Sequence, residues 1–232
     1  MARQPPAKPQ CLPLKRKAPR HLPQARDNSN VLKLGLTGGI ATGKSAVAAI
    51  LRELGFAVLD ADAMGHQLME PGEPAYGEIL KEFGAALAPD GGRIHRGELA
   101  RLVFADRSKL EKLNAILHPR IKKAMLRKFG EWQRAGDRDV VFVEAALLVE
   151  AGFHKELDGL VVTSCTPEQQ LARLIARGLT EAEAKRRLAA QLDPEEKLRH
   201  ATYTIDCSGS QEETRRQVAQ LAAEVHHKAA RT

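Results

Sequence analysis

The chain has 232 residues, 43% of them hydrophobic and 28% charged, which is the composition of an ordinary globular protein. This length suits one large α/β domain or a domain that carries insertions. No apolar run reaches the roughly 18 residues of a membrane span, so we expect no membrane partner. Three scattered cysteines exclude a disulfide scaffold and a zinc site and favour a reducing compartment, the cytoplasm.

The net charge of +7 lies almost entirely in the first 30 residues. They hold seven basic side chains, one acidic side chain and six prolines, without the apolar region of a secretory signal. Proline at this density prevents helices and central strands, so residues 1–30 are predicted to form a disordered basic tail. The body, residues 31–232, is nearly neutral, which argues against nucleic acid as a partner beyond weak contacts of the tail.

Apolar runs alternate with helical segments throughout the body. Strands are predicted, in chain order, at 31–36, 56–60, 140–143, 160–164 and 202–206. Helices are predicted at 45–54, over most of 61–134 with turns at Pro71–Gly72, Asp90–Gly92 and His118–Pro119, from Thr166 onward, and at 211–228. Apolar strands spaced by helices indicate an α/β fold with a parallel sheet covered on both faces. We therefore expect a core of 31–60 and 139–232 and a helical insertion of about 61–138 over the carboxyl edge of the sheet.

One segment matches the phosphate-binding pattern G-x-x-x-x-G-K-S/T in full: Gly38-Gly39-Ile40-Ala41-Thr42-Gly43-Lys44-Ser45. A chain of this length matches by chance about once in a hundred, and here the loop also follows a strand and opens a helix. The glycines let backbone N–H groups turn inward around a β-phosphate, and the helix adds its positive end. Lys44 is predicted to reach the β- and γ-phosphates and the Ser45 hydroxyl to hold Mg²⁺. With Ala46, these residues form the predicted ATP site.

Two classes of phosphate-loop protein are excluded by missing segments. A GTPase needs a base-reading N-K-x-D segment, and a transport ATPase needs an L-S-G-G-Q-type signature. Small-molecule kinases remain, and these need an acceptor pocket, a group near the acceptor hydroxyl, and arginines that neutralise the moving phosphoryl group.

Further segments accompany the loop in chain order: Leu36-Thr37-Gly38-Gly39-Ile40, Asp60-Ala61-Asp62, Glu70-Pro71-Gly72, His118-Pro119, Leu147-Leu148-Val149-Glu150, Arg173, Arg177, Gln191 and Ile205-Asp206. With these segments the chain resembles the dephospho-CoA kinases over about residues 34–209. The resemblance implies a P-loop kinase fold with five parallel strands in the order 2-3-1-4-5. It also implies transfer of phosphate from ATP, with Mg²⁺, to the ribose 3′-hydroxyl of dephospho-CoA, the last step of coenzyme A synthesis. We expect a monomer or a small homo-oligomer.

The resemblance assigns roles to two aspartates that close the second predicted strand. Asp62 is the predicted base beside the acceptor hydroxyl, and Asp60 is predicted to order magnesium-bound water. Their spacing places both on one side if the strand continues. Taken alone, each residue fits helix N-capping or a turn as well. Thr37, Arg96 and His118 are further substrate-binding candidates, although the last two also fit a surface ion pair and a helix end.

Arg173 and Arg177 stand four residues apart on one helix, so both face one way and suit a phosphate clamp or a solvated helix face. The charged segment 178–199 is the predicted lid over ATP, or else a plain surface hairpin. Glu150 is predicted to pin the lid or a loop, and Glu144 to sit in the outer magnesium shell.

The chain departs from the family pattern at four positions, where it has Glu144, Ala146, Thr202 and Cys207. Two alternatives to the predicted function remain open at this point. One is another small-molecule kinase, for a nucleoside or nucleotide, and the other is an ATP-gated nucleic-acid-binding protein that uses the basic tail.

Overall fold

The structure, a computed structural model, describes residues 31–231 apart from the side chain of Phe104, so the predicted tail 1–30 lies outside the described residues. One parallel sheet contains β1 (Leu32–Gly38), β2 (Ala57–Asp60), β3 (Val140–Glu144), β4 (Gly159–Ser164) and β5 (Tyr203–Asp206). The helices are α1 (Lys44–Glu53), α2 (Ala61–Gln67), α3 (Tyr76–Phe83), α4 (Arg96–Ala105), α5 (Arg107–Ala135), α6 (Pro167–Ala176), α7 (Glu181–Ala189), α8 (Pro194–Arg199) and α9 (Gln211–Ala229). Two short 3₁₀ turns are η1 (Ala85–Leu87) and η2 (Phe153–Glu156).

The strand order is β2-β3-β1-β4-β5, with every neighbouring pair parallel, which confirms the predicted fold. The central strand β1 pairs with β3 on one side and β4 on the other. In this register Glu144 is the partner of both Leu36 and Asp60. The carboxyl ends of β1, β2 and β3 therefore meet at one edge of the sheet, where ligands bind in open α/β sheets.

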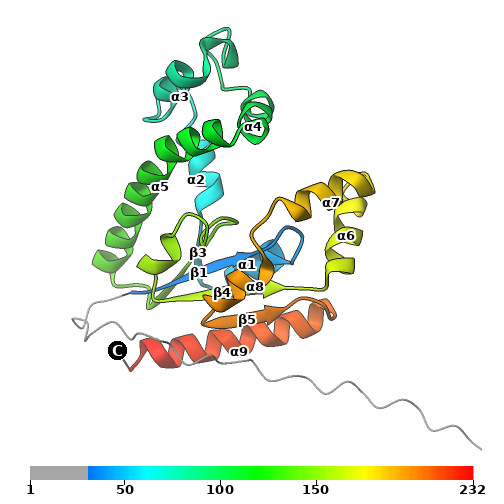
Figure 1. Cartoon of the computed structure of the whole chain (residues 1–232). Helices are drawn as coiled ribbons and strands as arrows, with labels where there is room; N and C mark the ends of the chain where they lie inside the picture. The colour runs from blue at the N-terminus through cyan, green and yellow to red at the C-terminus, as the bar shows by residue number, and fades with distance from the viewer. Residues whose placement is uncertain (1–30, 232) are drawn as a thin grey trace, which may run out of the picture.

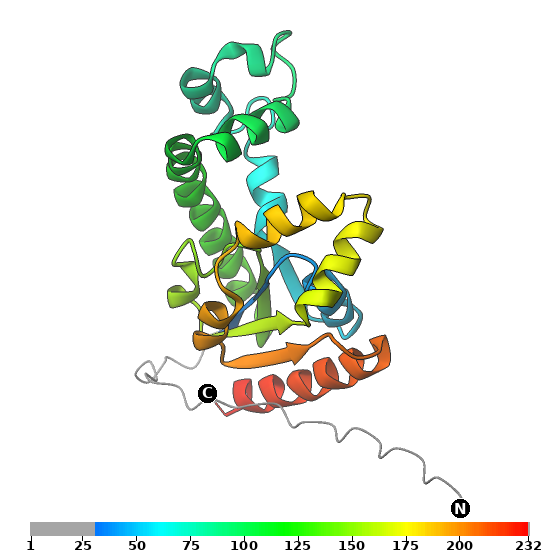
Figure 2. The ribbon, with the colours of Figure 1, turned by 45° about the vertical axis from the view of Figure 1, so that its right-hand side comes forward.

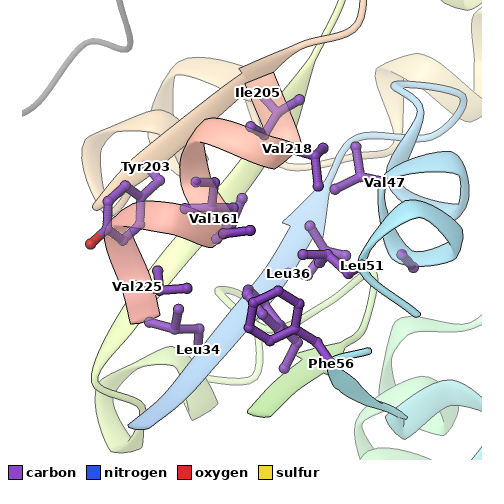
Figure 3. Packing of buried hydrophobic residues seen from close by; sticks show 14 of the residues in the cluster. Leu34, Leu36, Val47, Leu51, Phe56, Val161, Tyr203, Ile205, Val218 and Val225 are labelled. Carbon is purple, nitrogen blue, oxygen red and sulfur yellow. The ribbon is translucent and has the colours of Figure 1, made fainter. Parts of the chain in front are cut away.

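Alternate residues of the strands enter two separate cores, as the pleat requires. Leu34, Leu36 and Phe142 pack with α1 and α9 on one face, and Figure 3 shows Val47 and Leu51 of α1 directed at the same cluster as Val218 of α9. Val141 and Val143 pack on the other face with residues of α5 and α8. The sheet is thus covered on both faces. The carboxyl end of β1 is held in place by this packing and by the neighbouring strands.

Helices α2–α5 project beyond the sheet on one side, and α6 and α7 on the other (Figures 1 and 2). The projecting helices α2–α5 have a core of their own, which includes Met69, Ile79, Leu99 and Val103. The helices α6 and α7 share a smaller cluster with the phosphate-binding loop, made of Ala41, Leu174 and Ala184. Within residues 31–231, no helix combines the length and the apolar character that crossing a membrane requires.

The turn predicted at His118–Pro119 is wrong, because Pro119 lies inside the continuous 29-residue helix α5. Proline removes one helical hydrogen bond and crowds the preceding turn, which normally ends a helix. Here the guanidinium of Arg120 donates to the Ile116 carbonyl in that turn at 2.6 Å and also pairs with Glu78 of α3. Tertiary contacts of α5 with α2, α3 and α4 help to hold the helix despite the proline.

Candidate active site

Two cavities adjoin each other at the carboxyl edge of the sheet. The first, of about 930 Å³, is lined by the phosphate-binding loop, α1, Arg173, Arg177 and the start of α9. The second, of about 880 Å³, is lined by α2, α4, α5 and the segment after β3. Ala146, two residues after β3, lines both cavities. The two cavities therefore meet at this residue.

All nine residues predicted to bind ATP, Gly38 through Ala46, line the first cavity. Gly43 has a φ of 106° and Ala41 a φ of 61°, which turns successive backbone N–H groups toward the cavity. The amides of Ala41, Gly43, Lys44 and Ser45 have no acceptor among residues 31–231. Four unpaired donors at a helix N-terminus make a site for an anion.

The base of the loop is held by close contacts that only glycine permits. The hydroxyl groups of Thr42 and Thr163 lie 2.8 Å apart, and Thr163 is buried. A Cβ atom at Gly38 would collide with the Thr163 hydroxyl and lie 2.6 Å from that of Thr42. The first glycine of the motif is thus required by packing, in addition to any contact with phosphate.

Both backbone groups of Ile40 are engaged by glutamine side chains. Its N–H donates to Gln191 Oε1 at 2.6 Å, and its carbonyl accepts from Gln170 Nε2 at 2.8 Å. Gln170 is buried on α6, and Gln191 follows α7 within the predicted lid segment. The sequence pattern gave no signal for Gln170, because a glutamine on an amphipathic helix is an ordinary surface residue.

Lys44 forms an ion pair with Glu144 at 2.9 Å across the edge of the sheet. The second carboxylate oxygen of Glu144 pairs with Arg52 of α1 at 3.1 Å. Glu144 is buried, and a buried carboxylate is stable when both of its oxygens have charged partners. Glu144 was predicted to lie in the outer shell of a magnesium ion; in the structure both of its oxygens contact cations of the protein.

The two arginines of α6 both line the first cavity, as their spacing predicts, but their contacts differ. Arg173 donates to the Ala41 carbonyl at 3.0 Å and to the Cys207 carbonyl at 2.7 Å, so it ties the loop to the end of β5. Arg177 is exposed at the end of α6, and its guanidinium has no hydrogen-bond or ion-pair partner among the described residues. Its guanidinium is therefore available to an anionic ligand.

Asp60 and Asp62 do not share one side of a strand, because β2 ends at Asp60 and α2 begins at Ala61. Asp60 is the N-cap of α2, and its Oδ1 accepts the Ala63 N–H at 2.8 Å. Asp62 lies in the first helical turn, is exposed, and lines the second cavity. Its Oδ2 accepts the Ala146 N–H at 3.3 Å. Asp62 thus lies at the wall that divides the two cavities.

The other predicted substrate residues separate into two groups. Arg96 and His118 line the second cavity with Asp62. Burial lowers the pKa of His118, which favours the neutral imidazole. Thr37 is fully buried, and its hydroxyl donates to the Ala146 carbonyl at 3.2 Å. Thr37 therefore supports the dividing wall from behind and lines neither cavity.

A further charged residue, Lys197 of α8, was missed in the sequence. It is 1% exposed, and its ammonium donates to the Ala146 carbonyl at 2.8 Å and pairs with Glu150 at 2.9 Å. Glu150 was predicted to pin the lid or a loop. In the structure it contacts Lys197, which lies near the end of the predicted lid segment 178–199. Nothing in the sequence marks Lys197, which stands among charged residues of a short helix.

Comparison with known proteins decides the family. The dephospho-CoA kinase family model matches residues 32–213. The chain belongs to the dephospho-CoA kinase family. It is therefore a kinase, with ATP as its co-substrate, as the resemblance implied.

Members of the family from several bacteria match most of this chain. The dephospho-CoA kinase of Symbiobacterium thermophilum is 44% identical over 186 residues, which are 80% of this chain and 77% of the relative. A solved structure of a Thermus thermophilus protein has a TM-score of 0.69 at 34% identity and covers 84% of this chain and 98% of its own. The solved dephospho-CoA kinase of Campylobacter jejuni has a TM-score of 0.63 at 27% identity and covers 83% of this chain and 96% of its own.

Proposed function

We propose that this kinase transfers the γ-phosphoryl group of ATP to the ribose 3′-hydroxyl of dephospho-CoA and releases CoA and ADP. The observation that carries the assignment is the pair of adjoining cavities, one lined by unpaired phosphate-loop amides and the other by Asp62, with Ala146 in both walls. The family supplies the identity of the acceptor. An acceptor in the second cavity and a nucleotide in the first would face each other across that residue.

The first cavity has the donors that the triphosphate of ATP requires. The four unpaired amides and the N-terminus of α1 suit the β-phosphate, and Lys44 can turn from Glu144 toward the γ-phosphate. Arg177 supplies a second positive charge at the mouth of the cavity, and Arg173 holds Ala41 in its left-handed conformation. Positioning and charge stabilisation of this kind account for most of the catalysis in phosphoryl transfer.

Magnesium fits this arrangement, although no group of three His, Cys, Asp or Glu side chains among residues 31–231 forms a ready-made metal site. Mg²⁺ usually keeps several waters and takes only one or two protein ligands besides phosphate oxygens. The exposed Ser45 hydroxyl would be the direct ligand, and the Asp60 oxygen that does not cap α2 would hold bound water. When bound, the ion neutralises charge on the β- and γ-phosphates.

Asp62 is the residue that would orient the acceptor hydroxyl and accept its proton. Its carboxylate lies at the dividing wall and is exposed to the second cavity. Arg96 and His118 line the same cavity and would contact the rest of the acceptor. The neutral imidazole of His118 would serve as a hydrogen-bond partner rather than as a charge.

A coupled assay of ADP release tests the reaction. We expect ADP release to depend on dephospho-CoA, with nucleosides, nucleotides and DNA or RNA unable to replace it. Turnover with a nucleoside at the rate seen with dephospho-CoA would support the other small-molecule kinase instead. Stimulation by nucleic acid in the absence of dephospho-CoA would support the ATP-gated binding protein.

The role of Asp62 is tested by Asp62→Asn, with Asp60→Asn as the matched control on the same short segment. A general base contributes about 10²–10⁴-fold, so Asp62→Asn is expected to lower kcat within that range while ATP binding stays unchanged. Added Mg²⁺ is expected to restore part of the activity of Asp60→Asn and none of that of Asp62→Asn. A kcat for Asp62→Asn within about threefold of wild type, below the range of a general base, eliminates this role.

A further inference from the structure

We infer that Lys197 is a positioning residue, which holds the Asp62 carboxylate in its place through the backbone of Ala146. The two side chains contact the same residue from different directions. Asp62 accepts the Ala146 N–H, and Lys197 donates to the Ala146 carbonyl. This inference rests on the proposed role of Asp62 and adds to it a residue from a distant part of the chain.

The burial of Lys197 is the first argument for a specific role. A lysine is rarely buried completely, because its ammonium must exchange water for protein partners. Lys197 is 1% exposed, although Glu150, its ion-pair partner, has a side chain that is 25% exposed. An ion pair with Glu150 alone could form at the surface, where it would avoid the cost of burial. The buried position gives Lys197 the contact with Ala146 in addition.

Ala146 lies beyond the end of β3, so no helix or strand holds its backbone. β3 ends at Glu144, and the Ala146 carbonyl has two donors, Thr37 and Lys197. Thr37 is fixed because it belongs to the central strand β1. Lys197 is fixed because its neighbour Leu198 packs into the core beneath the sheet. The carbonyl is thus held from two rigid sides, and the Ala146 N–H that Asp62 accepts lies on the adjoining peptide group, one Cα atom away.

Lys197 belongs to the same predicted lid segment, residues 178–199, as Gln191. Gln191 lies between α7 and α8, and its side chain accepts the Ile40 N–H of the phosphate-binding loop. Two contacts six residues apart therefore join this segment to both sides of the site. Gln191 reaches the nucleotide side, and Lys197 reaches the wall beside Asp62. Because Gln191 makes its own contact with Ile40, loss of the Lys197 contact should affect the Asp62 side of the site and leave the nucleotide side in place.

The test compares Lys197→Met, which keeps the length of the side chain and removes its charge, with Lys185→Met. Lys185 lies on α7 of the same segment, is exposed, and pairs with Glu181 at 2.6 Å. Small displacements of a reacting group cost up to about a hundredfold, so Lys197→Met is expected to lower kcat by roughly ten- to a hundredfold. The KM for ATP should stay within about threefold, because the nucleotide cavity keeps its donors. Lys185→Met should retain wild-type kcat and KM.

A double-mutant cycle with Asp62→Asn distinguishes positioning from a general structural effect. If Lys197 acts through Asp62, adding Lys197→Met to Asp62→Asn should lower kcat by less than about twofold. Lys197→Arg keeps the charge and the donors and should recover most of the lost kcat. Equal losses in both backgrounds, or a kcat for Lys197→Met within about threefold of wild type, overturn the inference.

A count of folded protein and a second variant separate an effect on catalysis from a loss of folding. Kinetics are expressed per ATP-binding site, counted by nucleotide titration, so that unfolded protein does not lower kcat. If Lys197→Met does not fold, Lys197→Leu replaces it in the same cycle with the same expectations, because leucine also removes both donor contacts and leaves an apolar side chain at the buried position. Unchanged turnover in Asp62→Asn alone would count against the proposed role of Asp62. A strong effect of Asp62→Asn with additive losses would count against Lys197 only.

Discussion

Lys44 and Glu144 join the phosphate-binding loop to the neighbouring strand β3 by an ion pair of 2.9 Å. The lysine side chain is 17% exposed and the glutamate side chain 6%, so the pair is largely shielded from solvent. Arg52 compensates the other oxygen of the same carboxylate. The ammonium of Lys44 is therefore held at the edge of the cavity, and Glu144 keeps one charged partner when that ammonium turns toward a phosphate.

Lys44→Met is expected to abolish most phosphoryl transfer, because it removes charge stabilisation at the transferred group. Losses of about 10³-fold in kcat are typical for such groups. The fold should remain, with a loss of roughly 1.5–3 kcal/mol in unfolding free energy from the missing charge-assisted hydrogen bond. ADP release and denaturant unfolding measure the two effects. A kcat near that of wild type would contradict the assignment of the loop.

Gly43→Ala is expected to damage both the loop and the stability of the fold. The backbone φ of 106° is unfavourable for any L-residue, and a Cβ there would lie 2.8 Å from Cys207 Sγ. The matched control is Gly136→Ala, whose φ is 65° and whose Cβ would meet nothing within 4 Å. The control should cost about 1–2 kcal/mol from the left-handed backbone alone. Thermal unfolding and ATP titration should show a larger loss for Gly43→Ala, and equal losses would mean that the Cys207 contact is unimportant.

The sheet and the phosphate-binding loop could be predicted from the sequence because their signals are local. Apolar runs marked the five strands, and the motif fixed the position of the loop and of α1. The strand order came from the family resemblance, since periodicity does not determine which strands are neighbours. Pro119 shows the limit of local signals, because contacts of α5 with other helices outweigh the preference of proline to end a helix.

The candidate site was predictable where a motif specifies it and unpredictable where long-range contacts do. Asp62, Arg173 and Arg177 were found through the family pattern, and the structure places them around the two cavities. Gln170 and Lys197 were missed because burial gives them their contacts, and burial of a polar residue has no signature in a charged helix. Asp60 was predicted only in part, since its capping bond depends on where β2 stops.

Stability is expected to fall as the pH drops below about 6.5, where an ordinary histidine takes up a proton. Burial lowers the pKa of His118 and of His154 below this ordinary value. The unfolded chain therefore binds protons at a pH where the folded protein does not, which favours unfolding as pH drops through about 6.5. Denaturant titrations at several pH values should show this decline. His118→Gln should reduce it, and exposed His227→Gln should not; an identical decline in all three proteins would exclude His118 as a source.

Cys207 is expected to resist alkylation in the folded protein. Burial raises the pKa of its thiol to about 11, so only about one molecule in a thousand carries the reactive thiolate at pH 8. Iodoacetamide treatment followed by peptide mass mapping should modify Cys207 only after unfolding in denaturant. Modification of Cys207 at the same rate with and without denaturant would contradict the buried position beneath Gly43.

The shared wall at Ala146 has a consequence for the order of events in a catalytic cycle. Because the two cavities meet at Ala146, both substrates fit at the same time and the acceptor oxygen can attack the γ-phosphorus of ATP directly. No relay through a phosphorylated side chain is then needed, so initial-velocity plots should intersect rather than run parallel. A γ-phosphate made chiral with oxygen isotopes and sulfur should arrive on the product with its configuration inverted, the outcome of a single in-line displacement.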